Sequence, residues 1–245
     1  MRPALRWLLL VLCAFLALQL FFVARVALMV VVDPQSSAFQ RSEAWRIARE
    51  KGKLPWRQQW VDYDQMSDHL KRAVLASEDD GFSGHDGVDW DALEKAWQKN
   101  NRAEAQAAKR SAGSAKAQAP ASAKVVGGST ITQQLAKNLF LSGERTLLRK
   151  AQELILTGML ELLLDKRRIL ELYLNSVEWG EGVFGAQAAA QHYYRKNAAQ
   201  LTPFEAARLA VMLPRPKYFE KLPNSPYLGS RAATILARMG DARLP

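Results

Sequence analysis

The stretch GGSTITQQLAKNLF, residues 127–140, decides the fold class because it predicts where a helix begins. Thr130 and Gln133 have the spacing of a capping box, in which each side chain accepts a hydrogen bond from the backbone N–H of the other residue. Gly127 and Gly128 give the backbone freedom just before that start. Since no run of alternating polar and apolar residues is long enough for a strand, we predict a mainly α-helical body.

Apolar residues at helical spacing predict further helices on both sides of this stretch. They cover residues 42–53, 67–80, 89–100, 145–164, 166–179, 184–196 and 202–213. Residues 101–124 include no large apolar side chain, so burial cannot offset the cost of ordering them. We therefore predict a mobile, mildly basic loop there, with transient helix in its first half.

The N-terminal residues predict a membrane anchor. Residues 7–24 form an apolar run without a charge, and VALMVVV extends it beyond Arg25, which is long enough to cross a hydrocarbon core of about 30 Å. Arg2 and Arg6 precede it, which favours a cytoplasmic N-terminus and an exported body. A cleaved signal peptide is the alternative, but its apolar region would be shorter.

These features divide the chain into segments. We predict a cytoplasmic N-terminus at residues 1–6, a transmembrane anchor at 7–32 and a linker with a helix at 33–55. One domain follows at 56–220, and residues 221–245 form a C-terminal tail.

The charge balance limits the class of partner. The chain has 34 Lys+Arg against 24 Asp+Glu, a net charge of +10, which favours an anionic partner such as nucleic acid, anionic lipid or a phosphorylated substrate. Export disfavours nucleic acid. The single cysteine, Cys13, lies in the anchor, so the body has no disulfide. Three scattered histidines and one cysteine also do not make a zinc site, and we predict no metal held by protein ligands.

A cluster of acids in SEDDGFSGHDG, residues 77–87, stands out in so basic a chain. Asp and Gly are turn-forming residues, so a solvated turn is one interpretation. The other is that one acid performs chemistry in a cleft. The preceding helix, residues 67–80, is expected to place Glu78 in its C-terminal turn, which makes this carboxylate the first to consider.

The predicted helix at 145–164 has an unusual distribution of charge. Leu147, Leu154 and Leu162 belong to one apolar face, while the opposite face begins with charged residues and continues with leucines. We expect this helix to be buried nearly all round, with its charged half opening into a cavity. A structural ion pair between Arg149 and Glu153, four residues apart, is the alternative.

Polar and cationic side chains gather near the Gly-Gly helix start. Gln133 and Gln134 lie on the same face as Lys137, and Arg145 and Arg149 add two guanidinium groups. A helix N-terminus with such cations would suit a diphosphate. A surface helix with solvated side chains is the competing interpretation.

Taken together, these motifs resemble those of the peptidoglycan glycosyltransferases, glycosyltransferase family 51. EDDGFSGHDG, GGSTITQQLAKN, RKAQE and RRILELYLNSVEWGEGVFGAQAAAQHYY occur in the order of that family's five signatures, over about residues 56–216. The resemblance is closest to the monofunctional, membrane-anchored biosynthetic transglycosylases of Gram-negative bacteria.

The resemblance implies a lysozyme-like helical head with a smaller, membrane-associated jaw lobe at about residues 84–128, in addition to the transmembrane helix. It implies polymerisation of lipid II with release of undecaprenyl diphosphate, in the periplasm at the inner membrane. Its implied catalytic residues are Glu78, as general base on the acceptor 4-hydroxyl, and Glu153. Its implied substrate-binding and supporting residues are Ser129, Gln133, Gln134, Lys137, Arg145 and Arg149, and Asp79, Phe82 and His85.

Other features of the resemblance concern cofactors and partners. No cofactor is required by the sequence, and a divalent metal, Mg or Mn, would bind through the substrate's diphosphate. Transpeptidase motifs are absent, so other cell-wall synthesis and division proteins would act as partners in cross-linking. Two alternatives are a lytic enzyme of lysozyme-like fold, which would not need the Lys137 and Arg145 cations, and an inactive membrane-anchored scaffold.

Overall fold

The computed structural model describes residues 3–112, 128–141, 143–144 and 146–245. Its α-helices are α1 (Pro3–Leu28), α2 (Ala38–Lys51), α3 (Asp68–Glu78), α4 (Trp90–Ala112), α5 (Ile131–Phe140), α6 (Leu147–Leu163), α7 (Lys166–Ser176), α8 (Ala186–Tyr194), α9 (Pro203–Met212), α10 (Pro216–Glu220) and α11 (Pro226–Arg238). Three 3-10 turns, η1 (Tyr63–Gln65), η2 (Phe82–Gly84) and η3 (Ala198–Gln200), connect them. The mainly helical class predicted from the sequence is confirmed.

Three short strands are present where the sequence predicted none. β1 (Arg57–Gln58) pairs in parallel with β3 (Val183–Phe184), and β2 (Glu178–Gly180) pairs antiparallel with the other side of β3. Strands of two or three residues are too short to show an alternating pattern, which explains why they were missed. β2 also takes the last residues of the helix predicted at 166–179, since α7 ends at Ser176.

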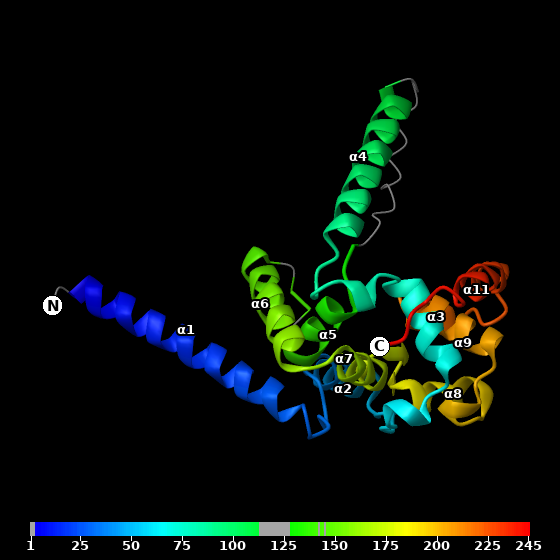
Figure 1. The fold of residues 1–245 in the computed structure, drawn as a ribbon, viewed down its shortest axis with the longest axis horizontal. Helices are drawn as coiled ribbons and strands as arrows, with labels where there is room; N and C mark the ends of the chain where they lie inside the picture. Colours follow the sequence, from blue (N-terminus) through cyan, green and yellow to red (C-terminus); the bar gives the residue numbers. More distant parts are fainter. Residues whose placement is uncertain (1–2, 113–127, 142, 145) are drawn as a thin grey trace.

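The core lies where α3, α9 and α11 pack together and where α5 packs against α6 and α7 (Figure 1). Leu70 of α3, Leu135 of α5 and Leu209 of α9 are completely buried in it. Helix α11 belongs to the same core through Leu228 and Ile235, so the segment predicted as a C-terminal tail contains a packed helix.

Helix α4 projects from the body and is longer than predicted (Figure 1). It continues through residues 101–112, which the sequence had assigned to the mobile loop, while residues 113–124 of that loop lie outside the described residues. Ala, Glu, Gln, Lys and Arg are strong helix formers, and a projecting helix does not depend on buried apolar side chains. The structure makes this half helical, beyond the transient helix that the sequence predicted, and its mobility stays a prediction.

Helix α6 is buried on the face that begins with charged residues and continues with Leu156 and Leu160. The face that contains Leu147 and Leu162 is exposed. Glu153, Leu156 and Leu160 are buried, whereas Leu147 is 90% and Leu162 is 85% exposed. The prediction that this helix is buried nearly all round was wrong. Spacing alone identifies two faces but does not say which one meets the core.

The apolar helix α1 is long and apolar enough to cross a membrane, and it extends away from the body (Figure 1). Its C-terminal part contacts the body: Val26 is completely buried, and the side-chain amides of Gln19 and Gln152 of α6 exchange hydrogen bonds of 3.2 and 3.1 Å. The Arg25 guanidinium lies 5.2 Å from the ring centre of Phe140 in α5. Helix α1 is therefore docked on α5 and α6, which line a cavity described below.

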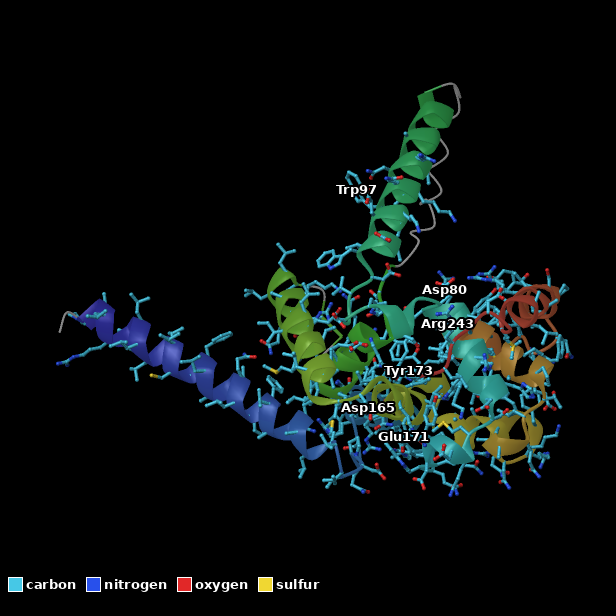
Figure 2. The ribbon with its side chains drawn as sticks, in the orientation of Figure 1. Asp80, Trp97, Asp165, Glu171, Tyr173 and Arg243 are labelled. Atoms are coloured by element: carbon cyan, nitrogen blue, oxygen red, sulfur yellow. The ribbon has the colours of Figure 1, made fainter. Side chains whose placement is uncertain are left out.

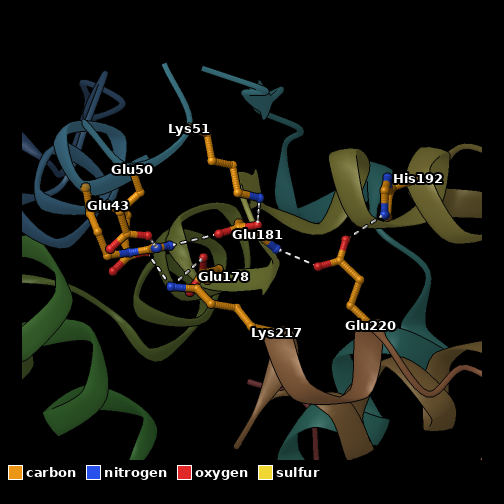
Figure 3. A network of polar contacts seen from close by, with 9 residues as sticks. Glu43, Glu50, Lys51, Glu178, Glu181, His192, Lys217 and Glu220 are labelled. Carbon is orange, nitrogen blue, oxygen red and sulfur yellow. Dashed lines mark hydrogen bonds and ion pairs between the residues drawn. The ribbon is translucent and has the colours of Figure 1, made fainter. Parts of the chain in front are cut away.

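A network of ion pairs ties α2 to the strands and to α10 (Figure 3). Arg46 binds Glu43 at 2.8 Å, and Lys217 of α10 contacts the same Glu43 carboxylate. Lys217 also lies 3.5 Å from Glu178 of β2, which is buried. Glu181, the residue after β2, binds Arg46 at 3.2 Å. This network holds α2 against the body.

Candidate active site

Glu78 is the last residue of α3, which ends two residues earlier than predicted but has Glu78 at its C-terminal end as expected. Ser67 caps the other end of this helix by accepting a hydrogen bond from the His69 N–H. Glu78 lines a cavity of about 300 Å³ together with Lys95, Lys99 and Arg238. The end of a rigid helix therefore presents a carboxylate to an open space.

The Glu78 carboxylate is held by a chain of hydrogen bonds. Its Oε2 accepts a hydrogen bond of 3.1 Å from Gln134 Nε2, and Gln134 Oε1 accepts one of 3.0 Å from the Tyr173 hydroxyl. Burial raises the pKa of Glu78, and the Gln134 hydrogen bond opposes that rise. Burial also raises the pKa of Tyr173 well above its usual value, so its hydroxyl keeps the proton it donates. Such a carboxylate is suited to accept a proton.

Asp79 connects the loop after Glu78 to the start of α5. Its Oδ2 accepts a hydrogen bond of 2.9 Å from the Ile131 N–H, and its Oδ1 lies 2.9 Å from His85 Nε2. The Gly87 N–H donates to His85 Nδ1 at 3.1 Å, so the ring proton resides on Nε2 and points at Asp79. Asp79 and His85 therefore organise the loop.

Gly87 must be a glycine for two reasons. Its φ is +86°, a left-handed value that side chains disfavour, and a Cβ would lie 2.6 Å from Thr157 Cγ2. The Gly87 carbonyl also accepts a hydrogen bond of 2.6 Å from Thr130 Oγ1. The close approach of this loop to α5 and α6 depends on that residue.

Phe82 anchors the same loop in the core. Its ring is 1% exposed, and Lys166 Nζ lies 4.6 Å from the ring centre. Lys166 also donates to the His85 carbonyl and binds Glu161 at 2.9 Å, and Glu161 accepts from Thr132 of α5. The sequence interpretation missed Lys166, Glu161 and Tyr173. Glu161 and Tyr173 stand among apolar residues of their helices, whereas Lys166 belongs to the run of charged residues 165–168, which gives no such signal.

Helix α5 begins at the predicted capping box. Thr130 Oγ1 accepts a hydrogen bond from the Gln133 N–H, and Gln133 Oε1 accepts one of 3.2 Å from the Thr130 N–H. The Gln133 oxygen is thus used by the cap, although the residue also lines the second cavity. The box fixes the direction in which α5 presents Gln134 and Lys137.

A second cavity, of about 390 Å³, lies beside the first. Its lining includes Ser129, Gln133, Gln134, Lys137, Arg149, Lys150 and Glu153. Ser129 lines both cavities, and Gln134 connects this one to Glu78 through the hydrogen bond described above. All the predicted substrate-binding residues that the structure describes meet here; Arg145 lies outside the described residues.

Cations dominate one wall of the second cavity. Arg149 Nη1 binds Glu153 Oε2 at 2.8 Å, and Lys150 binds the other oxygen of the same carboxylate. Lys137 stands nearby on α5, and desolvation lowers its pKa while Glu153 opposes that change. Three lining cations, Lys137, Arg149 and Lys150, against two lining carboxylates, Glu144 and Glu153, leave a net positive charge, which suits an anionic ligand.

No metal centre is formed by the described side chains: they include no group of three or more His, Cys, Asp or Glu residues that could hold an ion. Glu78 is instead bound to an amide, Asp79 to a backbone N–H and to His85, and Glu153 to two cations. Glu78, a carboxylate of raised pKa, thus lines the first cavity, which has room for a hydroxyl-bearing molecule. Its partner Gln134 lines the second, cationic cavity.

Comparison with known proteins relates this geometry to a family. The transglycosylase family model matches residues 47–240. The chain is 54% identical over 233 residues to the biosynthetic peptidoglycan transglycosylase of Burkholderia thailandensis, covering 95% of this chain and 84% of that protein. It is 49% identical over 247 residues to the protein of the same name from Herminiimonas arsenicoxydans, covering 100% of this chain and 99% of the relative.

Proposed function

This chain belongs to the transglycosylase family, and from that membership we propose that it polymerises the glycan strands of peptidoglycan. The growing lipid-linked glycan is transferred to the 4-hydroxyl of lipid II, and undecaprenyl diphosphate is released. The observation that carries this assignment is the position of Glu78, with the cationic cavity reached through its partner Gln134. A base and a site for an anionic leaving group are the two elements that the reaction needs.

Glu78 acts as the general base. Its carboxylate takes the proton of the acceptor hydroxyl as the hydroxyl oxygen bonds to the donor's anomeric carbon. The bond from that carbon to the diphosphate breaks, and its electron pair leaves with the diphosphate. Attack from the face opposite the leaving group inverts the donor configuration. A positioned base contributes about 10²- to 10⁴-fold to such a step.

Lys137, Arg149 and Lys150 stabilise the charge that develops on the leaving diphosphate. Glu153 contacts both Arg149 and Lys150, so its role is to orient these two cations. Arg149 Nε is buried and has no hydrogen-bond partner among the described residues. Preorganised donors of this kind act without a reorganisation cost at the moment of reaction.

We propose the placement in the cell from α1, a helix long and apolar enough to cross a membrane. We assign this helix as a single-pass anchor in the inner membrane, with a periplasmic catalytic domain of lysozyme-like fold and a jaw lobe that includes α4. A divalent metal would be brought by the substrate's diphosphate, since no described side-chain group could hold one. Addition of a chelator in the polymerisation assay tests this point. Full activity in its presence would show that the reaction needs no divalent metal.

The experiment that tests the function is incubation of the purified full-length protein with labelled lipid II. We expect polymer. Cleavage of preformed glycan would indicate a lytic enzyme, and no conversion would indicate a scaffold. Glu78→Gln should abolish polymerisation because the amide keeps the shape but cannot take the proton. Asp86→Asn, an exposed acid of the same loop, is the matched control and should retain activity.

A further inference from the structure

The C-terminal end of the chain lies against the loop that follows Glu78. Figure 2 labels Arg243, near the C-terminus, and Asp80, in the loop after Glu78, which we call the catalytic loop (residues 79–87). Arg238 Nη2 binds Asp80 Oδ2 at 2.7 Å, and Ser83 Oγ donates to the Arg243 carbonyl at 3.1 Å. The Arg72 guanidinium of α3 donates to the Ala242 carbonyl. We name residues 238–244 the C-terminal brace.

The C-terminal brace is fixed to the core. Met239 is 5% exposed and Ala242 is 4% exposed, and Leu244 packs against the same core. Helix α11, which leads into the brace, packs against α3 and α9. The brace therefore has a defined position, and its contacts hold Arg72, Asp80 and Ser83 relative to the core.

These contacts flank Glu78 on both sides in the sequence. Arg72 lies in α3 before Glu78, and Asp80 and Ser83 lie after it. Arg238 itself lines the same cavity as Glu78. A shift of the brace would move both the end of α3 and the start of the catalytic loop.

We propose that the C-terminal brace positions Glu78 for catalysis, and that Arg238 is a positioning residue acting through Asp80. This inference rests on the proposed polymerase function. Arg238 and Asp80 are both well exposed, and exposed ion pairs contribute little stability by themselves. The effect is instead one of geometry, because a small displacement of a catalytic group lowers the rate far more than it lowers stability.

The test compares steady-state polymerisation by full-length variants in the lipid II assay. Arg238→Ala should lower kcat by about 10-fold with an unchanged KM for lipid II, since a displacement of 1 Å can cost about 100-fold. Arg238→Lys keeps the charge that meets Asp80 and should recover most of the loss. Arg231→Ala is the control, because it removes an exposed arginine two turns earlier on the same helix, outside the cavity lining.

A double-mutant cycle with Asp80→Asn separates positioning from substrate binding. If Arg238 acts through Asp80, the double variant should be no worse than Arg238→Ala alone. A raised KM with unchanged kcat in Arg238→Ala, or additive losses in the double variant, would overturn the proposal in favour of direct binding. Activity of Arg238→Ala within twofold of wild type would overturn it as well.

Deletion of residues 241–245 tests the rest of the brace. This variant keeps α11 and Arg238 but loses the Ala242 and Arg243 carbonyls. We expect kcat to fall at temperatures well below its thermal midpoint. Ser83→Ala removes one of the same contacts without shortening the chain and should lower kcat in the same direction. Full activity of both variants would refute the brace. Wild-type polymerisation in the same assay tests the proposed function separately.

Discussion

Replacing Glu178 with glutamine should stabilise the protein at pH 8 and have little effect near pH 4. Glu178 is 5% exposed on β2, and its cation Lys217, at 3.5 Å, also serves Glu43 (Figure 3). Burial, opposed by Lys217 and reinforced by Glu43, raises the pKa of Glu178 to about 7 from 4.5. This carboxyl is therefore protonated in the folded protein at a pH where it is ionised in the unfolded chain.

The sign and size of the effect follow from that difference. A raised pKa contributes stability that is fully present below pH 4.5 and is lost as the pH rises through about 7. At about 1.4 kcal/mol for each pKa unit, the loss amounts to about 3 kcal/mol at most by pH 8. Glutamine does not titrate, so Glu178→Gln should gain up to this amount over wild type at pH 8.

Chemical unfolding of the full chain in detergent at pH 5 and pH 8 measures the difference. Glu181→Gln is the matched control from the same network, because hydrogen bonds from Lys51 and Arg46 lower the pKa of Glu181. The control should lose less than about 1 kcal/mol, and it should lose nearly the same amount at pH 5 and pH 8, because the stability from a lowered pKa is already largely present above pH 4.5. An equal free energy of unfolding for wild type and Glu178→Gln at pH 8 would refute the reasoning.

Further predictions concern the cleft. Lys137→Ala should lower kcat/KM by at least about 10-fold without changing the melting temperature, since a charge-assisted contact is worth about 1.5–3 kcal/mol; unchanged kinetics would contradict its role at the diphosphate. The acid limb of the pH profile of kcat/KM should lie above the usual carboxyl range, because burial raises the pKa of Glu78 and the base must be ionised; a limb at the usual value would assign it to another group. Glu153→Gln should lower both activity and melting temperature by releasing its two cations; loss of stability alone would leave it a structural role. Gly87→Ala should destabilise the protein by about 1–3 kcal/mol in urea unfolding, as expected for a left-handed backbone in a crowded position, and an unchanged midpoint would count against that strain.

Local features were predictable from the sequence. The capping box at Thr130 with Gln133 is formed, and Glu78 lies at the C-terminal end of α3 as expected. Capping and helical spacing depend on residues three or four positions apart, so the sequence contains all the information they need.

Features that depend on tertiary packing were not predictable in the same way. The Asp79 contact to the Ile131 N–H joins segments more than fifty residues apart, and no spacing rule relates them. The buried face of α6 is chosen by its partner α5, which explains why Leu147 and Leu162 are exposed against expectation. Resemblance to a family supplied the cleft residues that local reasoning could only propose.

The docking of α1 has a consequence for how the enzyme meets its substrate. Gln19 contacts α6 nine residues before the helix ends at Leu28, which corresponds to about 14 Å of helix rise. Contacts over that length restrict rotation of the catalytic domain relative to α1. With α1 spanning a bilayer, as we propose, the cleft would keep one height and one orientation relative to the membrane, and encounters with a lipid-linked substrate would reduce to lateral diffusion in a plane.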